Sequence, residues 1–295
     1  MRSNEITALI SLIEDPDPTI FSHVHKELTS YGEKVIPQLE MYWGINQYGD
    51  LFQQRVSRLI RSIKTETLQG SMKEWKHSEE CDLVEGLILL NKYQDPTVDE
   101  LEIKRLIARM RQDIWLELND SLTALETVNI FNHIIYNVYG LKGNKSDHTA
   151  PQNSYVMDVL SSKRGNSISL GAIYRVLAKS LDIPIHGISL PNHFLLAYVD
   201  ENIVKEVKID SVENNGILFY INPFSGGTII HRDEIDDFLF HLELPKKVAE
   251  YTPCSNEEII NRMIGNLIYA YTQFKNEERV DELQALKSVF TQPND

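Results

Sequence analysis

The stretch RGNSISLGAIYRVLAKSLDIP, residues 164–184, holds the strongest structural signal in the chain. Leu170, Ile173 and Leu177 recur at helical spacing, which predicts a helix over 167–181 with one buried face. A Gly-Asn-Ser turn precedes this helix and an Ile-Pro pair ends it. We expect Ser167 or Ser169 to cap the free N–H groups at its start. A serine in that position is either a helix cap or a nucleophile, and the stretch alone leaves both interpretations open.

Four short runs after this helix have the composition of β-strands. They are rich in β-branched and aromatic residues and are separated by turn residues. We therefore predict an α+β core, with an antiparallel sheet of roughly four strands and the helix packed on it. The runs are IHGISL at 185–190, HFLLAYV at 193–199, IVKEVKID at 203–210 and ILFYINP at 217–223.

The segments on both sides of this core are predicted to be helical. Residues 1–140 contain amphipathic helices that break at the Asp-Pro pairs of 15–18, and the first pair of helices resembles a HEAT-type unit. A stripe from Leu125 to Val138 is expected to face the interior. Residues 251–295 form two helices similar to a tetratricopeptide hairpin. We expect three parts: a helical region at 1–140, a core at 141–250 and a helical hairpin at 251–295.

The composition excludes several classes of protein. The 295 residues carry a formal net charge of −14, which argues against nucleic-acid binding and against attraction to an anionic membrane. Apolar runs are too short for a transmembrane helix, and the N-terminus does not resemble a signal peptide. Cys81 and Cys254 stand apart in polar contexts, so we expect reduced thiols in a cytoplasmic protein. No motif for a metal or another cofactor is present, and we expect none to be bound.

Three polar positions follow one another in an order that suggests a catalytic site. Ser167 begins the predicted helix, His193 begins an apolar strand, and Asn222 ends a strand before a proline. Each has an ordinary structural explanation: a helix cap, a hydrogen-bonded histidine and a turn initiator. The order nucleophile on a helix, then base and orienting residue on a sheet, is that of papain-like and transglutaminase-like enzymes.

The motifs around these positions resemble the bacterial SirB-type transglutaminase-like proteins, whose domain also occurs in a eukaryotic F-box protein. The helical lead-in and the RMIGNLIYAY segment at 262–271 are similar as well. The resemblance therefore covers most of the chain. The residues that carry it are Asn153-Ser154, Val159-Leu160, Arg164-Gly165-Asn166, Ser169-Leu170, Pro191, His193-Phe194, Asn222-Pro223-Phe224 and Gly226-Gly227.

The resemblance implies that Ser167 stands where the active enzymes have cysteine. It likewise places His193 at the catalytic histidine and Asn222 at the aspartate, so the triad appears as Ser-His-Asn. A serine must lose its proton to histidine during attack, and asparagine offers the resulting imidazolium no charge. The turn and strand residues beside these positions are expected to take part in binding: Gly165, Asn166, Ser169 and Asn192.

Two functions remain open at this point. The first is a non-catalytic transglutaminase-like protein that binds a small ligand, or a protein partner through its helical regions. The second is a cytoplasmic hydrolase or acyl transferase that uses Ser167 or Ser169 with His193. A role as a regulator of gene expression would follow only from the name of the resembled family, and the acidic charge argues against direct DNA contact. The oligomeric state is not indicated.

Overall fold

The computed structural model describes residues 2–44, 49–190, 193–200, 216–241 and 252–291. By internal contacts the chain divides into two compact units, Met1–Glu74 and Trp75–Asp295. The helical residues 75–140 therefore belong with the second unit, whereas the sequence suggested a boundary near 140. The expected three-part domain division stays a prediction.

The first unit is a small helical bundle with its own apolar core. Asp17 caps the second helix through Thr19, and Pro18 occupies the first turn, where its missing N–H is not needed. Arg55 donates to the carbonyls of Ile13 and Asp15 at 2.7 and 2.6 Å, which closes the end of the first helix. The expected break at 15–18 is confirmed. The helices are α1 Arg2–Ser11, α2 Pro18–Ser30, α3 Ile36–Trp43 and α4 Asp50–Lys76, with a 3-10 turn at Gly32–Val35.

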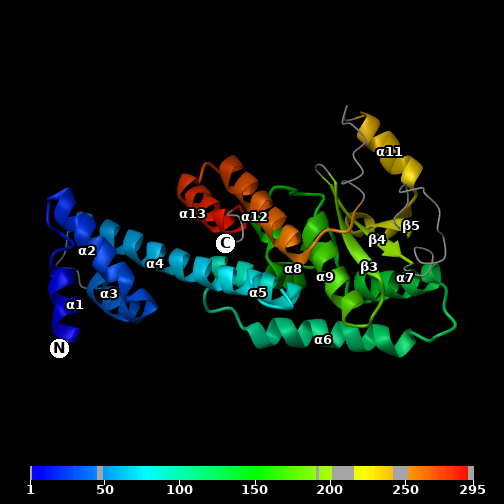
Figure 1. The fold of residues 1–295 in the computed structure, drawn as a ribbon, viewed down its shortest axis with the longest axis horizontal. Coiled ribbons are helices and arrows are strands. Elements are labelled where there is room, and N and C mark those ends of the chain that lie inside the picture. Colours follow the sequence, from blue (N-terminus) through cyan, green and yellow to red (C-terminus); the bar gives the residue numbers. More distant parts are fainter. Residues whose placement is uncertain (1, 45–48, 191–192, 201–215, 242–251, 292–295) are drawn as a thin grey trace. The chain divides into compact units, whose positions relative to one another are not determined.

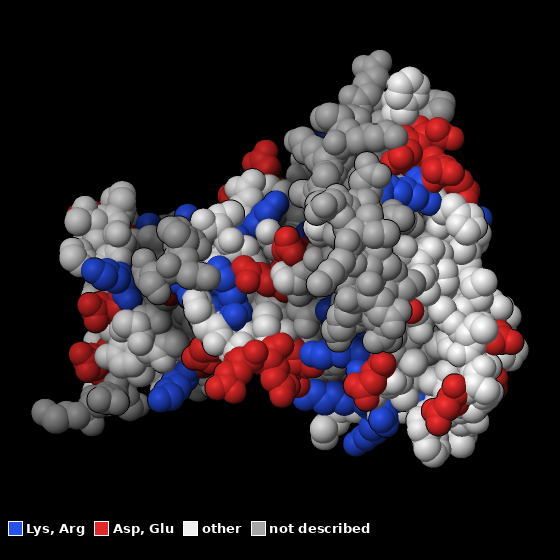
Figure 2. Space-filling model, turned by 45° about the vertical axis from the view of Figure 1, so that its right-hand side comes forward, with Lys and Arg blue, Asp and Glu red and all other residues white. Residues whose placement is uncertain are grey.

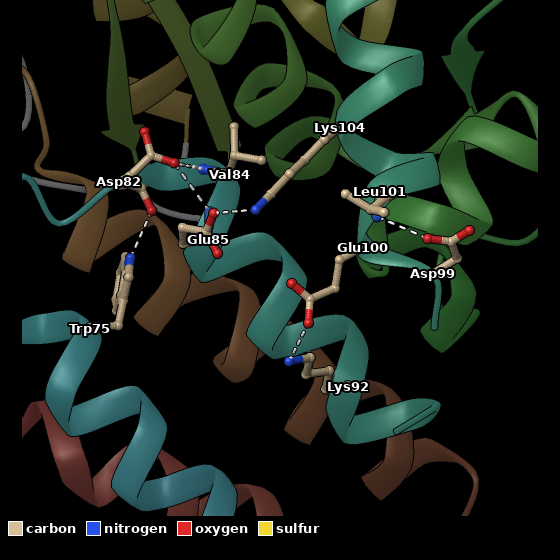
Figure 3. A network of polar contacts seen from close by, with 9 residues as sticks. All are labelled: Trp75, Asp82, Val84, Glu85, Lys92, Asp99, Glu100, Leu101 and Lys104. Atoms are coloured by element: carbon tan, nitrogen blue, oxygen red, sulfur yellow. Dashed lines mark hydrogen bonds and ion pairs between the residues drawn. The ribbon is translucent and has the colours of Figure 1, made fainter. Parts of the chain in front are cut away.

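Two capped helices begin the second unit (Figure 1). Asp82 accepts from the N–H groups of the first turn of α5, Leu83–Gln94, and Asp99 does the same for α6, Glu100–Glu117. Between these helices Lys104 pairs with Glu85 at 2.7 Å, as Figure 3 shows. Such exposed pairs contribute little stability, so the caps and the buried faces define these helices.

The next helix contradicts part of the predicted apolar stripe. Val128, Phe131 and Ile135 are buried, but Leu125 and Val138 are half exposed. The helix α7, Ala124–Asn132, continues as a π-helical turn at His133–Val138, which accounts for the exposure of Val138. Leu125 precedes this turn, at the start of α7. The wider turn rotates the later side chains away from the regular α-helical stripe.

The core of the second unit is a four-stranded antiparallel sheet in the order β3-β4-β5-β6. Helix α9, Ser167–Lys179, packs against β3 and β4, and its residues Leu170, Ile173 and Leu177 are buried as predicted. The α+β prediction is confirmed. The fourth strand, β6, was not indicated by the sequence. The fourth predicted run, at 203–210, lies outside the described residues. The strands are β3 Ile185–Leu190, β4 His193–Val199, β5 Ile217–Asn222 and β6 Thr228–Ile230.

Shorter elements complete the unit around this sheet. A two-residue parallel pair, β1 Lys142–Gly143 with β2 Arg164–Gly165, holds the turn before α9. Ser255 and Glu258 form a capping box at the start of α12. The remaining elements are a 3-10 turn at Pro151–Ser154, α8 Val156–Ser162, a 3-10 turn at Pro223–Ser225, α11 Arg232–His241, α12 Asn256–Gln273, α13 Glu277–Lys287 and a 3-10 turn at Ser288–Phe290.

Surface charge and helix hydropathy agree with the composition. On the face drawn in Figure 2, the coloured residues show acidic and basic groups interspersed, without a continuous basic stripe. Among the described helices, none is both long enough and apolar enough to cross a membrane.

Candidate functional site

A pocket of about 390 Å³ opens beside the start of α9. One wall is the segment 148–154, a second is the start of α9, and a third is formed by the start of β4 and the end of β5. Helix α12 provides the fourth wall. The pocket therefore brings together Ser167, His193 and Asn222, the three positions that the resemblance singled out. The lining residues are His148, Thr149, Ala150, Ser154, Asn166, Ser167, His193, Asn222, Phe224, Ser225, Asn266, Tyr269 and Ala270.

Asn166, rather than a serine, caps α9. Its Oδ1 accepts the Ser169 N–H at 2.9 Å, and the Asn166 N–H donates to Ser169 Oγ at 3.1 Å. This reciprocal arrangement is a capping box, and it corrects the prediction that Ser167 or Ser169 is the cap. Ser167 is instead the first helical residue, at the positive end of the helix dipole. Its hydroxyl is partly exposed and lines the pocket.

A buried polar network supports this turn from behind. Asn166 Nδ2 donates to Ser154 Oγ at 2.9 Å, and the Asn166 N–H donates to the Asn153 carbonyl at 3.3 Å. The side chain of Asn153 accepts from Asn144 Nδ2, also at 2.9 Å. Asn144, Asn153 and Ser154 are each at least 91% buried, so unpaired groups here would be costly. The network therefore fixes the backbone that presents Ser167.

Gly165 and Ser169 lie behind the pocket and do not line it. A Cβ atom at Gly165 would come within 2.7 Å of Ser169 Oγ, so this turn requires glycine. Ser169 is only 1% exposed, and its hydroxyl is held by the backbone of Asn166. Both residues shape the turn. Asn192, the fourth expected binding residue, lies outside the described residues.

His193 is the first residue of β4, at the mouth of the sheet. The residue is partly exposed, and the pKa of its imidazole is lowered, first by partial desolvation and second by the positive charge of Arg262. The ring is therefore neutral near pH 7, as a general base must be. Within the described part of the chain, however, no hydrogen bond joins Ser167 Oγ to this ring.

The side-chain oxygen of Asn222 stabilises the turn that follows β5. This Oδ1 accepts from the N–H groups of Phe224 and Ser225 at 3.0 and 3.2 Å. Gly226 and Gly227 follow with φ of 68° and 77°, which glycine adopts without strain. Any side chain at Gly227 would also collide with Asn132. The Asn222 carboxamide is therefore a structural cap at the edge of the pocket.

Neither cysteine lines the pocket. Cys254 is buried beside β3, where its N–H donates to the Gly187 carbonyl at 2.8 Å. Burial is the main cause that raises the pKa of its thiol to about 11, and burial also raises the pKa of Cys81. Thiols with raised pKa values are poor nucleophiles at neutral pH. Among the described residues, no group of three or more His, Cys, Asp or Glu side chains could hold a metal ion.

Sequence reasoning missed two walls of the pocket. His148 comes from a loop, and its ring packs against Phe224 with centroids 5.7 Å apart. Asn266, Tyr269 and Ala270 come from α12, which the sequence indicated as a helix of the C-terminal hairpin and as part of the resemblance, but not as part of a site. The spacing i, i+3, i+4 places these three on one helical face. A polar Asn beside an exposed Tyr was the available signal, since the same helix otherwise has an apolar buried face.

Comparison with known proteins identifies the family. A model of the transglutaminase-like superfamily matches residues 100–265, more than half of the chain. The chain belongs to the transglutaminase-like superfamily. This match runs from α6 into α12, so it includes Ser167, His193 and Asn222 but ends one residue before Asn266.

Similar proteins place the chain close to the SirB group of this superfamily. A UPF0162 protein of Xylella fastidiosa is 27% identical over 73% of this chain and 74% of its own length. Protein SirB1 of Salmonella typhimurium is 24% identical over 63% of this chain and 61% of its own length. F-box only protein 21 of Mus musculus is 24% identical over 48% of this chain and 21% of its own length. No solved structure matched the chain. The SirB-type resemblance is confirmed.

Proposed function

We propose that this chain is a non-catalytic transglutaminase-like protein that binds a protein segment or a small ligand in the pocket beside α9. One observation carries the proposal: the pocket contains the triad positions, but with a serine in place of the thiol and an Asn222 carboxamide that caps a turn. The pocket and its histidine are thus present, while the thiol and the carboxylate of the active triad are not.

The chemistry of the three positions supports binding over catalysis. A cysteine can exist as a thiolate stabilised by imidazolium, but the Ser167 hydroxyl must be deprotonated during the attack itself. The imidazolium formed on His193 would then need a negative partner, which a carboxamide cannot supply. In serine proteases, replacing the orienting aspartate by asparagine lowers turnover by about 10⁴-fold.

The pocket lining indicates the kind of group that would bind. Its side chains include hydroxyls, carboxamides, imidazoles and aromatic rings, and among the residues that the structure describes no carboxylate, ammonium or guanidinium group lines it. Ser167 Oγ and the Asn266 carboxamide can donate and accept hydrogen bonds. An uncharged polar group on an apolar or aromatic framework fits this lining best.

A photocrosslinking experiment tests the binding function. A benzophenone attached to Ser167→Cys, in a chain with Cys81→Ser and Cys254→Ala, should form a specific adduct with the bound partner in cells. The same label on Asp281→Cys, an exposed position of α13, serves as the control. Filling the pocket with Asn266→Trp should abolish the adduct from position 167. Equal adducts from both positions, or none from 167, would contradict binding of a protein segment. For a small ligand, native mass spectrometry of the purified protein should show a bound mass that Asn266→Trp abolishes.

A hydrolase or acyl transferase is the second candidate. Its support is the joint presence of Ser167 and a neutral His193 in one open pocket. A fluorophosphonate probe separates the two functions, because it labels serines that a base activates. Under the binding proposal, the protein should label no more than a Ser167→Ala, Ser169→Ala variant. Strong labelling that depends on Ser167 would establish the second candidate instead.

We also propose a cytoplasmic location, supported by the two free cysteines Cys81 and Cys254. Fractionation of cells that express the tagged chain tests this.

A further inference from the structure

Arg262 of α12 joins two neighbouring strands at the edge of the pocket. Its Nη1 donates to Ser189 Oγ on β3, and its Nη2 donates to the His193 carbonyl on β4 at 2.7 Å. In the sheet, Ser189 pairs with Phe194 and Leu190 pairs with His193. Both acceptors therefore belong to the last rungs of the β3–β4 ladder, next to the residue that enters the pocket.

The surroundings of this guanidinium suggest more than surface packing. Burial lowers the pKa of Arg262, and in the described part of the chain both of its partners are neutral oxygens. Removing a guanidinium from water without a carboxylate partner is costly. The rigid fork of arginine can nevertheless bridge two fixed acceptors, which a lysine cannot do.

The same helix also carries a wall of the pocket. Asn266 lies one turn after Arg262, and Tyr269 and Ala270 lie one turn further. These residues follow the end of the family match at 265. The position of α12 relative to β4 therefore sets the distance between Asn266 on one wall and His193 on another.

We propose that Arg262 is a positioning residue that ties α12 to the His193 end of β4 and so sets the width of the pocket. The inference rests on the proposed function only in taking this pocket as the binding site. Without the guanidinium, α12 and the β3–β4 hairpin lose their direct polar connection at this point. The walls that carry Asn266 and His193 then move relative to each other.

The charge of Arg262 provides an independent readout at His193. It disfavours protonation of the imidazole, in the same direction as burial. Among the described residues, Arg175 of α9 and Glu258 of α12 are further charged groups of these elements, and both act on the Cys254 thiol, as Arg262 does. Arg175 is a matched control, because it is also partly buried and also donates to neutral oxygens, those of Asn256 and Ile185.

NMR titration of the free protein tests the proposal with Arg262→Gln, Arg262→Lys and Arg175→Gln. In Arg262→Gln the titration midpoint of His193 should rise toward its ordinary value, and the backbone amide signals of both His193 and Asn266 should shift. Arg262→Lys keeps the charge, so the midpoint should stay near that of the unmodified protein while both amide signals still shift. Arg175→Gln should change neither.

Two results would overturn the proposal. One is an Asn266 amide signal that does not move in either Arg262 variant, because then α12 is held without the guanidinium. The other is an equal change in Arg175→Gln, because then any lost buried cation has the same effect. If Arg262→Gln does not fold, the amide signals of Arg262→Lys decide. No ligand is present in this titration, so failure of the crosslinking experiment and failure here are distinguishable.

Discussion

Two asparagine turns border the pocket, and they are built differently. Asn166 caps the start of α9 and Asn222 ends β5. The side-chain oxygen of Asn166 accepts one backbone N–H, and that of Asn222 accepts two. Asn166 also donates through its Nδ2 to the buried Ser154 hydroxyl. The bonds of the Asn222 oxygen, in contrast, are ones that a carboxylate oxygen could also accept.

This difference shows which turn can change its chemistry. At 166, the amide nitrogen is a required donor, so aspartate would lose a buried hydrogen bond. At 222, asparagine and aspartate are nearly equivalent caps, because both offer an oxygen to the following N–H groups. A charged residue could therefore stand at 222 without loss of the turn, and the present carboxamide is not required by the fold.

The largest expected effect concerns the helix behind the first turn. Leu177 is fully buried on α9, so Leu177→Ala should lower the free energy of unfolding by about 2–5 kcal/mol. Urea unfolding followed by circular dichroism measures this. A loss below about 0.5 kcal/mol would mean that α9 is not held by its buried face.

The next effect separates the network from the cap. Asn166→Ala should lower the free energy of unfolding by about 1–3 kcal/mol, since it removes both the cap and the partner of Ser154. Asn276→Ala is the matched control, because Asn276 caps the exposed start of α13 through one bond to Arg279 N–H. Equal losses in the two variants would show that the buried network adds nothing.

Much of this architecture was predictable from local sequence patterns. The spacing of Leu170, Ile173 and Leu177 gave the helix and its buried face, and β3 and β4 have the predicted bounds. Both signals depend on neighbouring residues, which a single sequence displays directly. The order of Ser167, His193 and Asn222 likewise predicted that these residues belong together, and they do line one pocket.

The remaining features depend on contacts between distant residues. The cap at Asn166 could not be distinguished from one at Ser167, because its choice rests on Ser154 and Asn153 behind the turn. The wall formed by Asn266 was hidden for the same reason, since only packing of α12 brings it to the pocket. The π-helical turn at His133–Val138 leaves no clear pattern in the sequence, and it shifted the predicted stripe.

A smaller effect is expected from the pH dependence of stability. The pKa of His193 is lowered in the folded chain, so the unfolded chain binds the proton more readily. Stability should therefore fall as the pH drops below about 6.5 and stop falling below the folded pKa. His193→Gln should flatten this part of the curve in urea unfolding between about pH 7.5 and 5, a range that brackets the ordinary histidine pKa of about 6.5. The variant His25→Gln is the control, because the pKa of His25 is also lowered by burial but His25 belongs to the first unit and does not line the pocket. If the His193→Gln curve has the full slope of the unmodified protein, His193 is not the group that titrates.

The smallest effect on stability is expected from a substitution at Asn222, although the same substitution should change the reactivity of the pocket. Asn222→Asp should alter the free energy of unfolding by less than about 0.5 kcal/mol, because an aspartate oxygen can accept the same N–H groups of Phe224 and Ser225. A loss above about 1 kcal/mol would show that the two turns resemble each other more than their bonds indicate.

Combined with Ser167→Cys, in a chain with Cys81→Ser and Cys254→Ala, the same change should give a thiol stabilised as thiolate by the helix start and His193. Iodoacetamide should then alkylate it at pH 6, where an ordinary thiol with a pKa of about 8.5 is almost wholly protonated. Ser167→Cys alone is the control and should react more slowly, since its imidazolium lacks the carboxylate. Equal rates would mean that position 222 cannot orient His193, even when it carries a carboxylate.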